Sequence, residues 1–174
     1  MIPAVRFFKL VWLDCKCSIN NRTSGFKKTV KIVKISASDT LRLRHLLLRP
    51  NDPISECIFP GDDEQTTGHF GALDDEKIVG IVSVYRRSNS NIAEENGFQI
   101  RAMATATSQR GKGFGSQLLY AAENFAMKNN ALYIWANARS HIVGFYTKLN
   151  YDIRSQEFVI SGVGPHLLVS KSFA

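Results

Sequence analysis

Cysteine is scarce in this chain of 174 residues, which contains only Cys15, Cys17 and Cys57. An odd and sparse set supplies no disulfide framework, and no Cys/His cluster has the ligand spacing of a zinc site. We therefore expect a reducing, cytoplasmic location and no metal cofactor. The sequence also lacks internal repeats, low-complexity tracts and any uninterrupted apolar run long enough to cross a bilayer.

Acidic side chains are almost missing from the first part of the chain. Residues 1–34 contain eight Lys and Arg but one acid, Asp14, which leaves fourteen residues of each sign in 35–174. The net charge of +7 therefore belongs to an appendage rather than to the domain. We expect a basic N-terminal extension at 1–29, either a tail or residues upstream of the true start, and a functional domain at 30–174. A transit peptide, or a segment that touches lipid or nucleic acid, is the alternative.

A hydrophobic content of 44% and a charged content of 21% are typical of one globular domain. Alternation, helical periodicity and turn residues predict its elements. In chain order these are strand 29–36, helix 40–49 with an N-cap at Ser38-Asp39, loop 51–68, hairpin strands 69–73 and 77–86, loop 89–97, strand 98–106, helix 114–130, strand 131–137, helix 140–150 capped by Ser140, and closing strands 151–162 and 166–173.

This order predicts an α/β protein with a mixed sheet of six to seven strands and flanking helices. The fourth and fifth strands, 98–106 and 131–137, enclose a helix, so they should be parallel by the right-handed crossover rule. The fifth strand is almost entirely apolar and should lie in the middle of the sheet.

The stretch "QRGKGFGSQLL" lies between the fourth strand and the following helix. The first N–H groups of a helix have no partner inside it, and together with the helix dipole they attract anions. Gly111, Gly113 and Gly115 allow a bulky anion to approach the backbone, while Arg110 and Lys112 add charge. The spacing matches neither the dinucleotide fingerprint nor the phosphate loop of ATPases. The stretch therefore predicts a phosphate or pyrophosphate site of another kind.

The run from Arg110 to Gly115 resembles the coenzyme A loop of the GNAT superfamily of N-acetyltransferases, Gln/Arg-x-x-Gly-x-Gly/Ala. Downstream, "NARSHIVGFYTKLNYD" resembles a second landmark of that family, an Asn at a strand end followed by a helix with Phe-Tyr. The resemblance covers residues 30–172 and extends to the order of elements. It implies the GNAT fold of acyl-CoA N-acyltransferases in a bacterial-type single domain. The implied activity is transfer of an acetyl group from acetyl-CoA to an amine.

The resemblance also implies where acetyl-CoA binds. The pyrophosphate would lie on backbone N–H groups of the glycine loop, and the pantetheine arm would run along the fourth strand as an extra strand. The second feature requires the fourth and fifth strands to splay apart. The cofactor-binding residues implied in this way are Met103, Ala104, Thr105, Arg110, Gly111, Lys112, Gly113, Phe114, Gly115, Ser116 and Asn137.

Acetyl transfer needs a proton acceptor for the amine and a proton donor for the thiolate. Tyr146 occupies the Phe-Tyr position of the family and would donate that proton, or would pack near the coenzyme. The Glu that many members have on the fourth strand is Gln99 here, which cannot accept a proton. His166, after "GVGP", is the first candidate for the base. A water relay, or a plain turn role for His166, is the alternative. Asn137 would bind pantetheine or cap the next helix.

The resemblance implies that the acceptor is a primary amine of a small molecule or protein, and loop 50–67 with the last turn would select it. Cys57 would line its pocket. The acidic run Asp62, Asp63 and Glu64 would attract a cationic amine or be an ordinary solvated loop, and we favour the second. A non-catalytic acyl-CoA binding or sensing module is the alternative function. We expect a monomer or homodimer with no nucleic acid or membrane partner.

Overall fold

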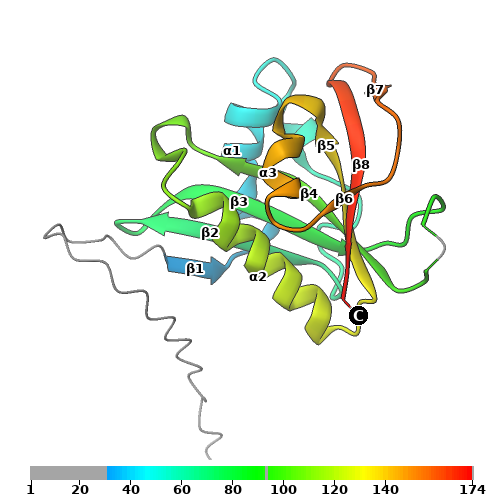
Figure 1. The fold of residues 1–174 in the computed structure, drawn as a ribbon. Helices are drawn as coiled ribbons and strands as arrows, with labels where there is room; N and C mark the ends of the chain where they lie inside the picture. The colour runs from blue at the N-terminus through cyan, green and yellow to red at the C-terminus, as the bar shows by residue number, and fades with distance from the viewer. Residues whose placement is uncertain (1–30, 93, 174) are drawn as a thin grey trace, which may run out of the picture.

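The computed structural model describes residues 31–92 and 94–173. The basic extension 1–29 and the predicted domain start at Val30 lie outside the described residues. In the described part, a single mixed sheet has the strand order β1-β2-β3-β4-β5-β8-β6, and β7 pairs with β8 (Figure 1). No helix of this part is long and apolar enough to cross a membrane.

The elements follow the predicted order. The strands are β1 (Lys31–Lys34), β2 (Gly68–Asp74), β3 (Lys77–Arg86), β4 (Gly97–Thr105), β5 (Tyr133–Arg139), β6 (Asp152–Ile153), β7 (Phe158–Ile160) and β8 (Gly164–Ser172). The helices are α1 (Ala37–Leu48), α2 (Phe114–Lys128) and α3 (Val143–Thr147), with 3-10 turns η1 (Ile54–Cys57), η2 (Thr107–Gln109) and η3 (Ser140–Ile142).

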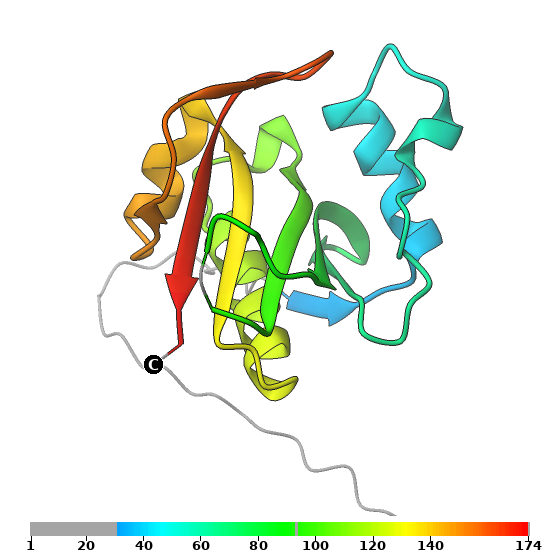
Figure 2. The same cartoon turned by 90° about the vertical axis from the view of Figure 1, so that its right-hand side faces the viewer.

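Strands β4 and β5 are parallel, as predicted, but they pair over a short distance. Their register joins Gly97–Gln99 to Tyr133–Trp135 and then stops. Beyond this point the two strands diverge, which is visible in Figure 2. The β3–β4 register shifts between Ile81 and Ser83, opposite Ala102, whose φ is +49°. A bulge of this kind bends a strand away from its neighbour, so it explains the predicted splay.

The sheet has two different faces. Phe98 and Ile100 of β4 lie in the main core with Leu118 and Ala122 of α2. Because side chains alternate along a strand, Gln99 and Arg101 point to the opposite face. Helix α1 packs against β3 and β4 on that face. The predicted central position of β5 is confirmed, since it lies between β4 and β8.

Helix α1 starts earlier than predicted. The sequence analysis placed its N-cap at Ser38-Asp39, but the N-cap is Ser36. The Ser36 hydroxyl accepts the N–H of Asp39 at 3.2 Å, and the Asp39 carboxylate accepts the N–H of Ser36 at 2.9 Å. This reciprocal capping box satisfies two N–H groups that a start at Ser38 would leave open.

The last part of the chain is more broken than predicted. Helix 140–150 is a 3-10 turn followed by α3, and Ser140 does not cap it because its hydroxyl is buried without a hydrogen-bond partner in the described part. The predicted strand 151–162 is split into β6 and β7, so the described residues form eight strands where six to seven were expected. Between them, the Ser155 hydroxyl accepts the N–H of Leu168 at 2.9 Å, so a side chain replaces a strand bond there.

Candidate active site

The glycine loop presents free backbone at the start of α2. Gly113 is the N-cap with φ +84°, and none of the side chains that the structure describes caps the first turn. The first helical bond runs from Gln117 N–H to the Gly113 carbonyl at 3.2 Å. A Cβ at Gly111 or Gly113 would meet no described atom within 4 Å, so space is open there. This arrangement of uncapped N–H groups suits a phosphate ligand.

The basic residues of the loop differ in their contacts. Lys112 donates to Gln109 Oε1 at 2.9 Å, and Gln109 donates to Asp74 Oδ2 at 2.7 Å, which ties the loop to the β2–β3 hairpin. Arg110 is exposed. Phe114 is 6% exposed and lies in the main core, so only its backbone is turned to a ligand. Ser116 is half-buried in the first turn of α2.

The predicted pantetheine segment lies where β4 has left β5. Ala104 and Thr105 pair with Ile81 and Gly80 of β3 on one side. The register with β5 has already ended at Gln99. The edge of Met103–Thr105 that faces β5 is therefore not paired with that strand, and an extended ligand chain would fit against it.

Tyr146 meets this segment from α3. It is 3% exposed, and its hydroxyl donates to the sulfur of Met103 at 3.7 Å. Its ring lies edge-on to Phe145 and Tyr151, each with centroids 5.3 Å apart. A Cβ on Gly115 would lie 3.4 Å from Phe145, so the first turn of α2 packs against the same aromatic group. The glycine loop, the β4 segment and the predicted acid thus come together.

Burial raises the pKa of the Tyr146 phenol above its ordinary value. The phenol is protonated at neutral pH, as an ordinary tyrosine is, so it can donate a proton. Because a raised pKa makes it a weaker acid, the predicted donor role depends on the position of the hydroxyl beside Met103 and not on the pKa.

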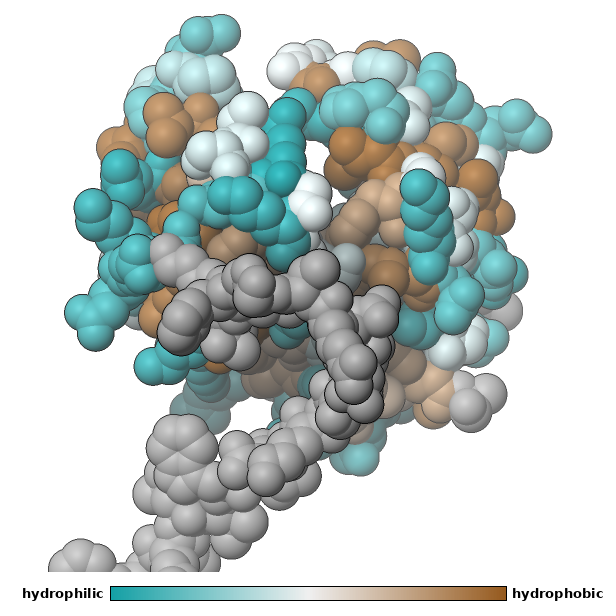
Figure 3. Space-filling view, turned by 60° about the vertical axis from the view of Figure 1, so that its left-hand side comes forward, coloured by the Kyte–Doolittle hydropathy of each residue, from teal (hydrophilic) through white to brown (hydrophobic). Residues whose placement is uncertain are grey.

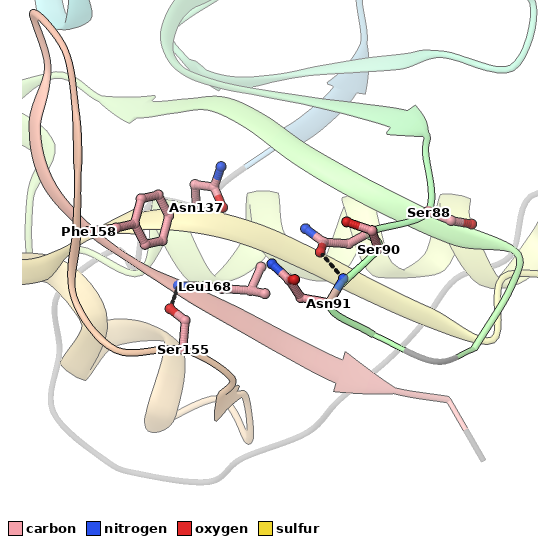
Figure 4. Close-up of a pocket in the computed structure, with 8 residues that line it drawn as sticks. Ser88, Ser90, Asn91, Asn137, Ser155, Phe158 and Leu168 are labelled. Atoms are coloured by element: carbon pink, nitrogen blue, oxygen red, sulfur yellow. Dashed lines mark hydrogen bonds between the residues drawn. The ribbon is translucent and has the colours of Figure 1, made fainter.

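Asn137 lies on the other side of the splay. It is exposed, and it lines a pocket of about 380 Å³ on the face opposite α2 (Figure 4). The wall of the pocket comes from the β3–β4 loop, β5, β8 and the segment around β7. The lining residues are Ser88, Asn89, Ser90, Asn91, Asn137, Ser155, Phe158 and Leu168. Polar amides and hydroxyls dominate it, so it suits a polar ligand.

His166 lies beside this pocket, not in its lining. It is 4% exposed and stacks on Phe158, with ring centroids 6.3 Å apart. Its Nδ1 lies 2.7 Å from the Gly164 carbonyl. A carbonyl only accepts, so Nδ1 carries the hydrogen and Nε2 is the nitrogen that can take up a proton.

The opening where β4 and β5 diverge is visible on the surface. In Figure 3 a notch separates two bodies, with hydrophobic side chains along one wall and hydrophilic ones along the other. Together with the divergence of β4 and β5 in Figure 2, it indicates an opening between the strands.

A buried polar network under loop 50–67 was missed by sequence reasoning. Arg44 of α1 is fully buried and binds both oxygens of Asp62, at 2.6 and 2.9 Å. It also donates to Ser83 and Tyr85 of β3, at 2.8 and 3.1 Å. His69 completes the network, since its Nδ1 lies 2.8 Å from the Ser83 hydroxyl. The network fastens the loop to the sheet and to α1.

Asp62 corrects the expectation of an ordinary solvated loop. Its side chain is 3% exposed, whereas Asp63 and Glu64 are exposed as expected. Burial alone would raise the pKa of Asp62, but hydrogen bonds from Arg44 and Tyr85 outweigh it and lower the pKa to about 2. Burial and the bond to Asp62 raise the pKa of Tyr85 to about 12.

Cys57 was expected to line the acceptor pocket, but it is fully buried. Its carbonyl accepts a hydrogen bond from Arg44 at 2.8 Å, so the residue helps to hold the loop instead. Within residues 31–92 and 94–173, no group of three or more His, Cys, Asp and Glu could hold a metal ion.

Comparisons with known proteins agree with one another. A sequence model described as "Acetyltransferase (GNAT) family" matches residues 39–151. An uncharacterized N-acetyltransferase of Bacillus subtilis, YitI, is 31% identical over 143 residues, which are 82% of this chain and 96% of the relative.

Solved structures share the fold. An aminoglycoside 6'-N-acetyltransferase in complex with coenzyme A superimposes with a TM-score of 0.65 at 14% identity, covering 83% of this chain and 97% of the other. A GNAT acetyltransferase from Streptococcus pneumoniae gives 0.62 at 18% identity, covering 84% and 100%.

Proposed function

Since this chain belongs to the GNAT family of acetyltransferases, and is thus an acyltransferase, we propose that it moves the acetyl group of acetyl-CoA directly to a primary amine of a small molecule or protein. The observation that carries the proposal is the meeting of the Tyr146 hydroxyl with Met103, 3.7 Å apart, beside the first turn of α2. It puts a proton donor next to the strand edge where the thioester arm would lie.

In the proposed complex the pyrophosphate rests on the N–H groups of the glycine loop. Support comes from the uncapped first turn and from the open space at Gly111 and Gly113. Arg110, Lys112 and Ser116 border the anion and supply charge-assisted or hydroxyl contacts. Phe114 and Gly115 contribute backbone N–H groups.

The pantetheine arm continues along Met103, Ala104 and Thr105 as an added strand. Support comes from the unpaired edge that the splay creates beside these residues. Asn137 lies on β5, and its side-chain amide would bond to the pantetheine arm or to a group beside the arm.

The acetyl group then passes directly from the thioester to the amine. The amine nitrogen attacks the thioester carbonyl, the new C–N bond forms, and the C–S bond breaks as the oxyanion collapses. Tyr146 gives its proton to the departing sulfur, and the amine loses one proton to a base. We assign that base to His166, through Nε2, directly or by a water that crosses the pocket.

The test is a calorimetric titration of acetyl-CoA into the full chain, followed by an acceptor screen that measures release of free CoA thiol. Saturable binding with acceptor-dependent release of CoA is expected. Absence of acetyl-CoA binding would overturn the proposal, including the assignment of the glycine loop as the pyrophosphate site.

Gln99 favours a second candidate function, because it occupies the position at which many members of the GNAT family have a Glu. A non-catalytic acyl-CoA sensing module would bind acetyl-CoA as tightly but release no CoA with any amine. The same screen therefore separates the two functions.

A further inference from the structure

Two arginines lie on the face of the sheet that α1 covers, next to loop 50–67. The guanidinium of Arg101, from β4, stacks on Phe59 with its carbon 4.4 Å from the ring centroid, and lies 5.7 Å from the centroid of Tyr85. Arg87, which follows β3, lies 5.6 Å from the same Tyr85 ring. Arg101 is half-buried. Stacking fixes the flat faces of a guanidinium and leaves the N–H groups at its edge to bind an acceptor.

The charges around Arg101 are unbalanced. Arg101 lies near Arg44, Arg87 and one buried carboxylate, Asp62. The two oxygens of Asp62 are already bound by Arg44 and Tyr85, and Arg87 donates to the Pro60 carbonyl at 2.9 Å. Among residues 31–92 and 94–173, no ion pair within 4.0 Å joins an Asp or Glu to Arg87 or Arg101. Immediately around the partly desolvated guanidinium of Arg101, the cations Arg44 and Arg87 therefore outnumber the one carboxylate, Asp62.

The position of Arg101 relates it to the proposed site. Gln99 pairs with Trp135 in the last step of the β4–β5 register. Two residues further on, the same register would bring Arg101 opposite Asn137, on the same face, if the strands did not diverge. Arg101 and the pocket that Asn137 lines thus stand on the two sides of the splay.

Resting on the proposed function, we propose that the acetyl acceptor is a small amino acid-like molecule that carries a carboxylate besides its amine, and that Arg101 binds this carboxylate. The planar fork of a guanidinium matches a carboxylate in two parallel hydrogen bonds. Arg87 adds charge at longer range. The same surplus repels polycationic acceptors such as aminoglycosides, so the substrate class differs from the one named for the superimposed aminoglycoside enzyme.

The first experiment uses the full chain, acetyl-CoA and matched acceptor pairs. The pairs are the common amino acids with a free carboxylate and the same amino acids as carboxamides. We expect kcat/KM, from CoA release, to be about 10- to 100-fold higher for at least one acid than for its amide. Equal rates for acid and amide would overturn the inference, as would acetylation only of diamines, aminoglycosides or phosphoethanolamine. Acetyl-CoA binding with no acetylation of any acid in the panel would also count against it.

The second experiment replaces Arg101 by Met, which keeps a long apolar stem against Phe59. For the preferred acid, KM should rise about 10- to 100-fold with little change in kcat, while the preference over the amide disappears. Arg101→Lys should retain part of the preference, because charge remains but the fork is lost. Arg86→Met is the matched control. Arg86 is exposed, and its guanidinium donates to Asn96 at 3.2 Å and not to a residue of the Arg101 site.

The two proposals fail in different ways. Loss of acetyl-CoA binding would belong to the proposed function and is measured separately by calorimetry. Normal acetyl-CoA binding and turnover in Arg101→Met, with the acid preference intact, would refute the carboxylate role alone. Thermal melting of each variant guards against a folding defect, and Arg101→Lys provides a milder change should Arg101→Met melt early.

Discussion

The hydroxyl of Tyr146 donates to the sulfur of Met103 at 3.7 Å, across the place where β4 and β5 have separated. A phenol and a thioether are a weak hydrogen-bonding pair, so this contact does not explain why a tyrosine stands there. On the proposed mechanism another sulfur, the thiolate of the coenzyme, comes to the same neighbourhood and accepts the proton.

Tyr146→Phe separates chemistry from binding. We expect kcat to fall at least about 100-fold, because a placed general acid is worth 10²–10⁴ in rate, while the Kd of acetyl-CoA changes little. Steady-state kinetics and calorimetry measure the two effects. Tyr151→Phe is the control, since its ring lies 5.3 Å from that of Tyr146 and the hydroxyl that it loses has no role in the proposed transfer. Equal loss of binding and turnover would assign Tyr146 to packing.

Gly113→Val tests the anion site. Its φ of +84° and its open surroundings mean that a side chain would strain the turn and project into the space that the pyrophosphate needs. We expect the Kd of acetyl-CoA to rise at least about 10-fold.

Gly162→Val controls for the strain. Gly162 has φ +72° and equally open surroundings, but it lies in the turn after β7. Both variants should lose similar thermal stability, and only Gly113→Val should lose acetyl-CoA. A weakened Kd in both would point to general strain instead of a blocked site.

Asp62→Asn tests the buried network. Removing one partner of a buried ion pair costs about 3–5 kcal/mol, so we expect a loss of that order in the free energy of unfolding at pH 7. Folding lowers the pKa of Asp62 from 3.8 to about 2. Its contribution is complete above the unfolded pKa and is lost as pH falls through the folded one.

The difference in stability between the native chain and Asp62→Asn should therefore shrink between about pH 4 and pH 2. Denaturant unfolding at several pH values measures it. Asp63→Asn is the control, because Asp63 is exposed next to it. A difference that stays constant over this interval would contradict the assignment.

Gly97→Ala tests the packing that supports the pocket. A Cβ there would overlap the Tyr133 ring, which is fully buried and whose hydroxyl accepts the Asn89 N–H at 2.8 Å. We expect a loss of about 1–3 kcal/mol, by denaturant unfolding, as for other overpacked cores. Gly144→Ala should be neutral or slightly stabilising, since its helical position has open space. Similar effects of the two changes would disprove the close contact.

The regular elements could be predicted because local signals agreed. Hydrophobic periodicity defined α2, and the turn at Asp75-Glu76, with φ of +46° and +61°, closed the predicted hairpin. The capping box at Ser36 was also readable, as a Ser followed three residues later by an Asp. It was overlooked because Ser38-Asp39 looked like an equally good start.

The buried network could not be predicted in the same way. Arg44 and Asp62 are 18 residues apart, and each looks like a surface charge in its local sequence. Their burial depends on how the loop closes over α1, which no local pattern encodes. Phe59 between two other nonpolar residues was a weak signal that the loop packs inward. The unpaired charge of Arg101 could not be predicted either, because it depends on Asp62 being bound by Arg44 and Tyr85.

The bulge at Ala102 has a consequence for the order in which the two substrates bind. The β4–β5 pairing ends at Gln99, and beyond it a slot is left along the edge of β4 that faces β5. On the proposed binding mode the coenzyme arm fills this slot and forms one wall of the space between Arg101 and Asn137. An acceptor that arrived first would meet an unfinished wall. On this binding mode we expect acetyl-CoA to bind before the amine.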